Sequence, residues 1–174
     1  MGDLFGDFIP SNWIQRVLEH ATHFPKTNFL FLTKNPARYH EFLGEMPKNA
    51  ILGATIETNN DQIFLTSMIS EAPPPSGRYA AMKDLDWDKK IVSIEPVLDF
   101  EPKTFSQWIG DIFPFLVYVG YDNYNNKLNE PTLSKTLGLL DKISENTLVV
   151  KKTIRQAWYE AQHGDIGDWS GQRS

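Results

Sequence analysis

The sequence of 174 residues contains no cysteine. This absence excludes disulfide bonds, a cysteine nucleophile, thiolate zinc sites and an iron–sulfur cluster held by this chain alone. The sequence also lacks any apolar run near the roughly 18 residues that a membrane-spanning helix needs. Its first residues, MGDLFGDFIPSNW, carry two acids and no basic segment, so we expect no signal peptide. These absences together predict a cytoplasmic protein without membrane attachment.

Basic charge is also scarce, with 17 Lys and Arg residues against 22 Asp and Glu residues and a net charge of -5. A protein that coats nucleic acid non-specifically needs a basic surface, so nucleic acid is not an expected partner. Glycine-rich phosphate loops and a G-x-S-x-G nucleophile motif are missing. The four histidines have no metal-ligand spacing, so we expect no metal site.

What remains is typical of one soluble globular domain. Hydrophobic residues make up 41% of the chain and charged residues 22%, and the length suffices for a proper core. We predict a domain over residues 1–163. The Gly, Asp and Ser residues that follow predict a flexible tail over residues 164–174.

Short apolar stretches that begin near positions 28, 51, 91, 115 and 147 predict buried β-strands. Segments with helical spacing separate them, including a first helix with Ser11 as N-cap and a last helix over 154–161. The inner face of the first helix is expected to consist of its apolar residues Trp13, Ile14, Val17, Leu18 and Ala21. Strands that alternate with helices every thirty residues or so predict βα units and a parallel sheet. A closed barrel needs eight units. The predicted fold is therefore α/β, a partial (βα) TIM-like barrel or an open sheet with about five parallel strands.

The segment KKIVSIEPVLD places an acid, Glu95, directly after a predicted buried strand and before Pro96. Because α/β sheets bind their ligands at the carboxyl ends of the strands, Glu95 is a candidate binding residue. The other strand ends supply further polar side chains, namely Thr33, Lys34, Glu57, Asp122 and Lys151.

These strand-end residues allow three interpretations. Lys34 or Lys151 could form ion pairs with Glu57 or Glu95 that only stabilise the sheet. The same side chains could instead line a polar pocket for a small ligand with ammonium and hydroxyl groups. In the third interpretation, Glu57 and Glu95 act as the acid and base of a barrel enzyme.

The succession MGDLFG, FLFLTKNP, LGATIET, VSIEPVL, VYVG and VVKK resembles a family of phage-associated, radical-SAM-like proteins of unknown function. The wider fold of that family is similar to that of the spore photoproduct lyase group. The resemblance extends from Met1 to about Trp158, and the LTKNP and SIEP segments are its most specific parts.

The resemblance implies a partial barrel that binds S-adenosylmethionine at its strand ends. It implies that Asp3 follows the second barrel strand and holds the amino group of the cofactor. Thr33 and Lys34 would end the third strand, and Glu57 the fourth. Glu95, Gly120 with the nearby Asp122, and Lys151 would follow at later strands.

Two departures from the family pattern change what we expect of this chain. The cysteines that bind the [4Fe-4S] cluster in the family are missing, so the chain by itself should not cleave S-adenosylmethionine. Gly120-Tyr121-Asp122 stands where relatives carry Gly-Gly-Glu. We expect the sequence to begin after the cysteine-bearing unit, which would leave a sheet edge exposed and favour a homo-oligomer. A binding module without catalysis is the resulting alternative.

Overall fold

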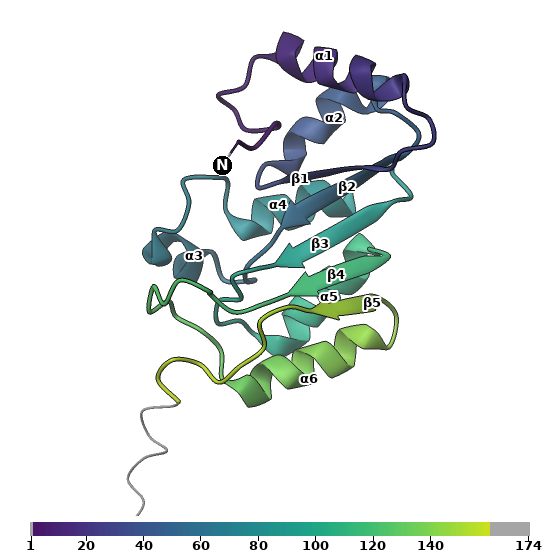
Figure 1. Ribbon diagram of the computed structural model, residues 1–174. Coiled ribbons are helices and arrows are strands. Elements are labelled where there is room, and N and C mark those ends of the chain that lie inside the picture. The colour runs from purple at the N-terminus through teal and green to yellow at the C-terminus, as the bar shows by residue number, and fades with distance from the viewer. Residues whose placement is uncertain (1, 161–174) are drawn as a thin grey trace, which may run out of the picture.

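Five parallel strands form the centre of the fold in the computed structural model, which describes residues 2–160 (Figure 1). The strands are β1 (Phe29–Thr33), β2 (Ala50–Thr55), β3 (Lys90–Ile94), β4 (Leu116–Val119) and β5 (Leu148–Lys151). The helices are α1 (Ser11–Thr22), α2 (Tyr39–Phe42), α3 (Asp61–Ser67), α4 (Pro75–Lys83), α5 (Pro102–Ile112) and α6 (Leu133–Ser144). Two short 3-10 turns, Pro36–Arg38 and Leu43–Glu45, flank α2.

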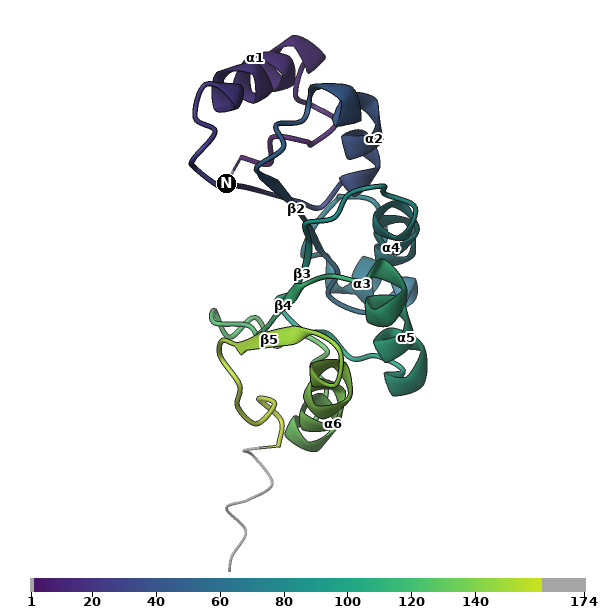
Figure 2. The same ribbon diagram turned by 90° about the vertical axis from the view of Figure 1, so that its right-hand side faces the viewer.

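The strands lie side by side in the order of the chain, and every neighbouring pair is parallel. Helices α2, α4, α5 and α6 all lie on one face of the sheet (Figure 2). This succession is that of consecutive units in a (βα) barrel, where each crossover has the same hand. The predicted α/β fold, with five parallel strands alternating with helices, is confirmed.

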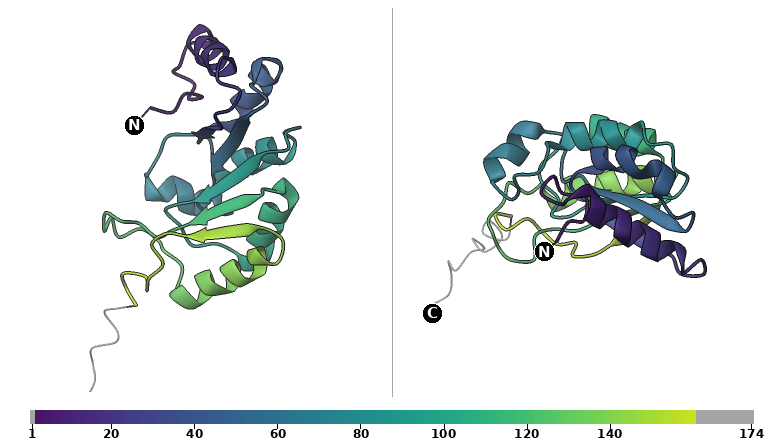
Figure 3. Two further views of the ribbon diagram at one scale, coloured as in Figure 1. Left: turned by 45° about the vertical axis from the view of Figure 1, so that its right-hand side comes forward. Right: turned by 90° about the horizontal axis from the view of Figure 1, so that it is seen from above.

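The two faces of the sheet differ in what covers them. Strand residues such as Leu52, Val92 and Val117 are fully buried between the sheet and the helices. The alternate residues lie on the opposite face of the sheet, which we call the open face. Among the described helices, only α1 lies near this face, and it lies beyond the β1 edge (Figure 3, left).

The strand register aligns the open-face side chains into rows. One row contains Leu32, Gly53, Ile91, Leu116 and Leu148. A Cβ atom at Gly53 would lie 2.7 Å from Cγ1 of Ile91 and 3.1 Å from Cδ1 of Leu32. Gly53 therefore leaves room for the side chains of its two neighbours in the row.

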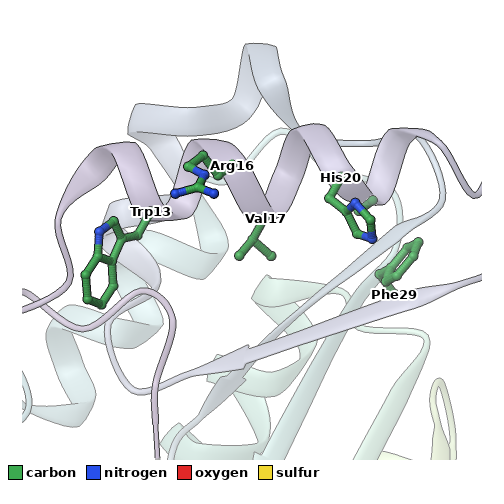
Figure 4. Close-up of a pocket in the computed structure, with 6 residues that line it drawn as sticks. Trp13, Arg16, Val17, His20 and Phe29 are labelled. Atoms are coloured by element: carbon green, nitrogen blue, oxygen red, sulfur yellow. The ribbon is translucent and has the colours of Figure 1, made fainter.

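The first predicted helix forms, but with a different start and a different inner face. Ser11 is its first residue, the preceding Pro10 is the N-cap, and no side chain caps the helix. Trp13 and Val17 were expected on the buried face but are 57% and 41% exposed. Helix α1 lies beyond the β1 edge of the sheet (Figure 1). Trp13 and Val17 line a cavity there together with Phe29 of β1 (Figure 4).

The predicted helix over 154–161 is wrong for its described part, because residues 154–160 form turns and irregular backbone. Side chains accept hydrogen bonds from two of their backbone N–H groups instead. The N–H of Trp158 donates to the distant Glu130, and the N–H of Ala157 donates to Glu160 within the same segment. Residue 161, the predicted domain end at 163 and the predicted tail over 164–174 lie outside the described residues.

Candidate functional site

The carboxyl ends of the strands carry a row of charged side chains on the open face. Strand alternation brings Glu95, Gly120 and Lys152 side by side, one position beyond the last paired residues of β3, β4 and β5. Lys152 Nζ lies 2.9 Å from Glu95 Oε2. A Cβ atom at Gly120 would lie 3.1 Å from Glu95 Oε1, so the glycine leaves room for this carboxylate.

Glu57, at the end of β2, is fully buried and accepts a cation on each oxygen. Lys34 Nζ bonds to Oε1, and Arg78 Nη1 donates to Oε2 at 2.8 Å. Because both oxygens are used, this arrangement favours an ion-pair role for Glu57 over that of a free acid or base.

Arg78 is the functional neighbour that the sequence reasoning missed. It extends from α4, is 1% exposed and also donates to the carbonyls of Thr55 and Pro73. Burial lowers the pKa of its guanidinium, and the charge of Glu57 opposes that shift. Nothing in the sequence pattern around Arg78 showed that an arginine would reach the strand ends.

Asp3 connects the N-terminal loop to the end of β1 through hydrogen bonds. Its Oδ2 accepts from the Thr33 hydroxyl and the Lys34 N–H, each at 2.8 Å, and its Oδ1 accepts from the Phe5 N–H at 3.0 Å. The structure thus brings three of the predicted site residues, Asp3, Thr33 and Lys34, into direct contact.

A cavity of about 540 Å³ opens beside these three residues, and we call it the strand-end cavity. The N-terminal loop supplies Asp7 and Phe8 to its wall, and the segment before α4 supplies Glu71. The Phe8 ring is 74% exposed, and a Cβ atom at Gly6 would lie 2.6 Å from it. Gly6 therefore allows the ring to fold over the loop.

Asp122 and Lys151 lie away from the strand-end cavity. The Asp122 carboxylate accepts from the backbone N–H groups of Tyr124 and Asn126, and it borders a separate cavity of about 490 Å³. Lys151 is exposed and lines a third cavity, next to Leu148. Lys152, its neighbour in sequence, is the lysine that reaches Glu95.

Residues 1–104 match a family described as protein of unknown function (DUF5131). The chain belongs to the DUF5131 family. The matched region contains Asp3, Lys34, Glu57, Arg78 and Glu95, so it includes the strand-end cavity and most of the charged row. No curated protein and no solved structure matches the chain.

Residues 2–160 of this DUF5131 protein contain neither a membrane-spanning helix nor a cluster of metal ligands. None of the helices there has the length and apolar character needed to cross a bilayer. Within the same residues, no three His, Asp or Glu side chains are grouped so that they could hold a metal ion.

Proposed function

We propose that this DUF5131 chain binds a small ligand of nucleoside or amino-acid type in the strand-end cavity. The observation that carries the proposal is an exposed aromatic ring, Phe8, beside the carboxylates of Asp7 and Glu71 and the ammonium of Lys34. An aromatic face is suited to stacking on a base, and the charged groups are suited to the polar end of such a ligand.

The carboxylates determine which ligands fit best. Asp7 and Glu71 are both exposed at the cavity wall and can accept from an ammonium group. Lys34, 31% exposed, is the cation available to a ligand carboxylate, although it also pairs with Glu57. Asp3 contributes by holding the loop, since its oxygens already accept three hydrogen bonds.

S-adenosylmethionine is the first ligand to test, because it combines adenine, an ammonium and a carboxylate. The resemblance to radical-SAM-like proteins supports the same choice. The residues of this chain do not fit a [4Fe-4S] cluster, which needs thiolates that the sequence lacks. We therefore propose that this chain alone binds the ligand without radical chemistry. The alternative of an enzyme that uses Glu57 and Glu95 as acid and base is disfavoured, because Glu57 is paired with Lys34 and Arg78.

Calorimetry with S-adenosylmethionine and S-adenosylhomocysteine tests the proposal. We expect binding at or below millimolar ligand, and Phe8→Ala should weaken it about tenfold or more, since base stacking contributes ~1–3 kcal/mol. Tyr124→Ala is the matched control, because Tyr124 is also an exposed aromatic residue but borders another cavity. No heat with either ligand, or an equal loss in both variants, would overturn the proposal.

A further inference from the structure

The turn between α5 and β4 presents two phenylalanine rings to solvent. Phe113 is 80% exposed and Phe115 is 46% exposed, and the buried Pro114 stands between them. The turn lies at the end of the sheet where the strands begin, whereas the strand-end cavity lies at the opposite end, near the arrowheads (Figure 1). Phe113 and Phe115 therefore belong to a separate surface, which we call the strand-start patch.

The backbone at Phe113 is unfavourable for a residue with a large side chain. Its φ of 56° and ψ of 53° lie in the left-handed region, where glycine is the usual residue at the end of a helix. Its N–H donates to the carbonyl of Gly110 at 3.0 Å, and a glycine would make the same hydrogen bond. The fold gains little from the phenyl ring, because most of it is exposed. An exposed aromatic ring at a strained position indicates a binding role.

The turn that carries the two rings is held in place on both sides. Pro114 fixes its own backbone φ, and the N–H of Phe115 donates to the carbonyl of Lys90 at 3.0 Å. Both rings are thus presented from a fixed backbone. A partner that binds them would not have to order a loop, which lowers the entropic cost of binding.

A cavity of about 770 Å³ extends from the two rings to the end of α6 and the start of β5. Leu148, which is 66% exposed, adds a third exposed apolar side chain to its wall. Interfaces concentrate their binding energy in apolar side chains that fill such pockets. The cavity is therefore suited to one or two apolar side chains of a partner.

The charged part of the cavity wall is mainly acidic. Asp88 and Asp141 line it, both are exposed, and neither forms a salt bridge within residues 2–160. Helix α6 ends at Ser144 in the same wall, and the last carbonyls of a helix carry a partial negative charge. Lys151 is the one basic side chain among the described residues of the wall. This balance favours a cationic partner and disfavours nucleic acid or an acidic segment.

We propose that the strand-start patch docks a segment of a partner protein that combines apolar side chains with Lys or Arg. The apolar side chains lie against Phe113, Phe115 and Leu148, and the cations pair with Asp88 and Asp141. Because the patch and the strand-end cavity lie at opposite ends of the sheet, docking does not depend on the proposed ligand site, and both can be occupied together.

A library of short random peptides, displayed on phage and selected on the full chain, tests the proposal. We expect the enriched peptides to carry apolar residues and a net positive charge. As labelled synthetic peptides they should bind the parent chain in fluorescence polarisation, more weakly as salt is added. Phe113→Gly should weaken binding about tenfold or more, as for an aromatic residue at the centre of an interface. Asp88→Asn combined with Asp141→Asn should weaken binding and reduce its salt dependence.

Two controls separate docking from damage to the fold. Phe113→Gly should raise the melting temperature, because glycine adopts the left-handed backbone without strain. Tyr124→Ala removes an equally exposed aromatic residue from the loop after β4 and should leave peptide binding unchanged. No enrichment, enriched peptides without positive charge, or equal binding to the Phe113→Gly variant would overturn the proposal.

The same variant distinguishes the other possible occupants of the patch. Self-association of the parent chain in light scattering that Phe113→Gly abolishes would assign the patch to a second copy. Binding to phosphatidylcholine vesicles that Phe113→Gly abolishes would assign it to a membrane surface. Either result would contradict a cationic protein segment as the occupant.

Discussion

Glu57 and Glu95 occupy equivalent places at adjacent strand ends, but their environments differ. Glu57 has no exposed surface and is held by Lys34 and Arg78. The Glu95 side chain is 22% exposed and pairs with Lys152, whose side chain is 47% exposed. A buried charge that loses its partner costs far more than an exposed one, because water cannot replace the lost contact.

The two acids should therefore respond differently to the same substitution. Glu57→Gln leaves the buried guanidinium of Arg78 without its counter-charge, and we expect a loss of about 3–5 kcal/mol in the free energy of unfolding. Glu95→Gln removes a solvent-screened pair and should cost about 0–1 kcal/mol. Urea denaturation of both variants measures the difference. Equal losses would contradict the assignment of Glu57 as the buried centre of the charged row.

Helix α5 begins at a carboxylate that satisfies its free backbone donors. Glu101, the N-cap, accepts from the N–H groups of Lys103 at 3.1 Å and Thr104 at 2.7 Å. These hydrogen bonds, those of Thr104 foremost, lower the pKa of the Glu101 carboxyl in the folded state. A carboxyl whose pKa is lower in the folded state stabilises the fold at any pH above its unfolded-state pKa of about 4.3. This stabilisation is lost as the pH falls through the lower folded-state pKa.

Glu101→Ala should lower the melting temperature by a few degrees near neutral pH, because the cap is removed. The difference from the parent chain should shrink as the pH falls through the lowered pKa of the Glu101 carboxyl, because the parent cap then also becomes protonated. A series of thermal melts from neutral to acid pH measures this effect. Glu145→Ala, at an exposed pair with Lys142, is the control and should change little. A difference that does not depend on pH would argue against a charged cap.

A buried acid, Glu130, makes several of the contacts that hold the last described segment to the body of the molecule. Glu130 accepts from both terminal nitrogens of Arg155, at 2.8 and 2.9 Å, and from the Trp158 N–H at 3.1 Å. The hydrogen bond to Glu130 raises the pKa of Arg155. The segment after β5 is thus fixed by side chains, without a helix of its own.

Glu130→Ala should release this segment while the sheet stays intact. We expect amide hydrogen exchange over residues 152–160 to accelerate tenfold or more, since hydrogen bonds to charged groups contribute about 1.5–3 kcal/mol. Exchange in β2 and β3 should not change. Hydrogen-exchange mass spectrometry provides both measurements. Acceleration spread equally over the sheet would show that Glu130 supports the whole fold instead.

The sequence was sufficient for the strands because each one repeats a local pattern. A strand of this kind is marked by a run of apolar β-branched residues that ends in a polar residue, such as the run that ends at Glu95. This pattern involves only neighbours in the chain, so it can be recognised from the sequence alone. The same reasoning correctly placed Lys34 and Glu57 at strand ends. The wrong helix over 154–161 shows the limit, since distant Glu130 holds Arg155 and Trp158 in irregular backbone.

Three features depended on contacts between distant parts of the chain. Arg78 reaches Glu57 from a helix, Lys152 rather than Lys151 faces Glu95, and α1 lies beyond the β1 edge of the sheet. Strand alternation shows that Lys151 and Lys152 point to opposite faces, but which of them faces Glu95 depends on the register between strands. The register and the meeting of separate elements are set by packing. Local pattern thus established that this is a parallel α/β sheet with polar strand ends, while packing established which of those ends come together.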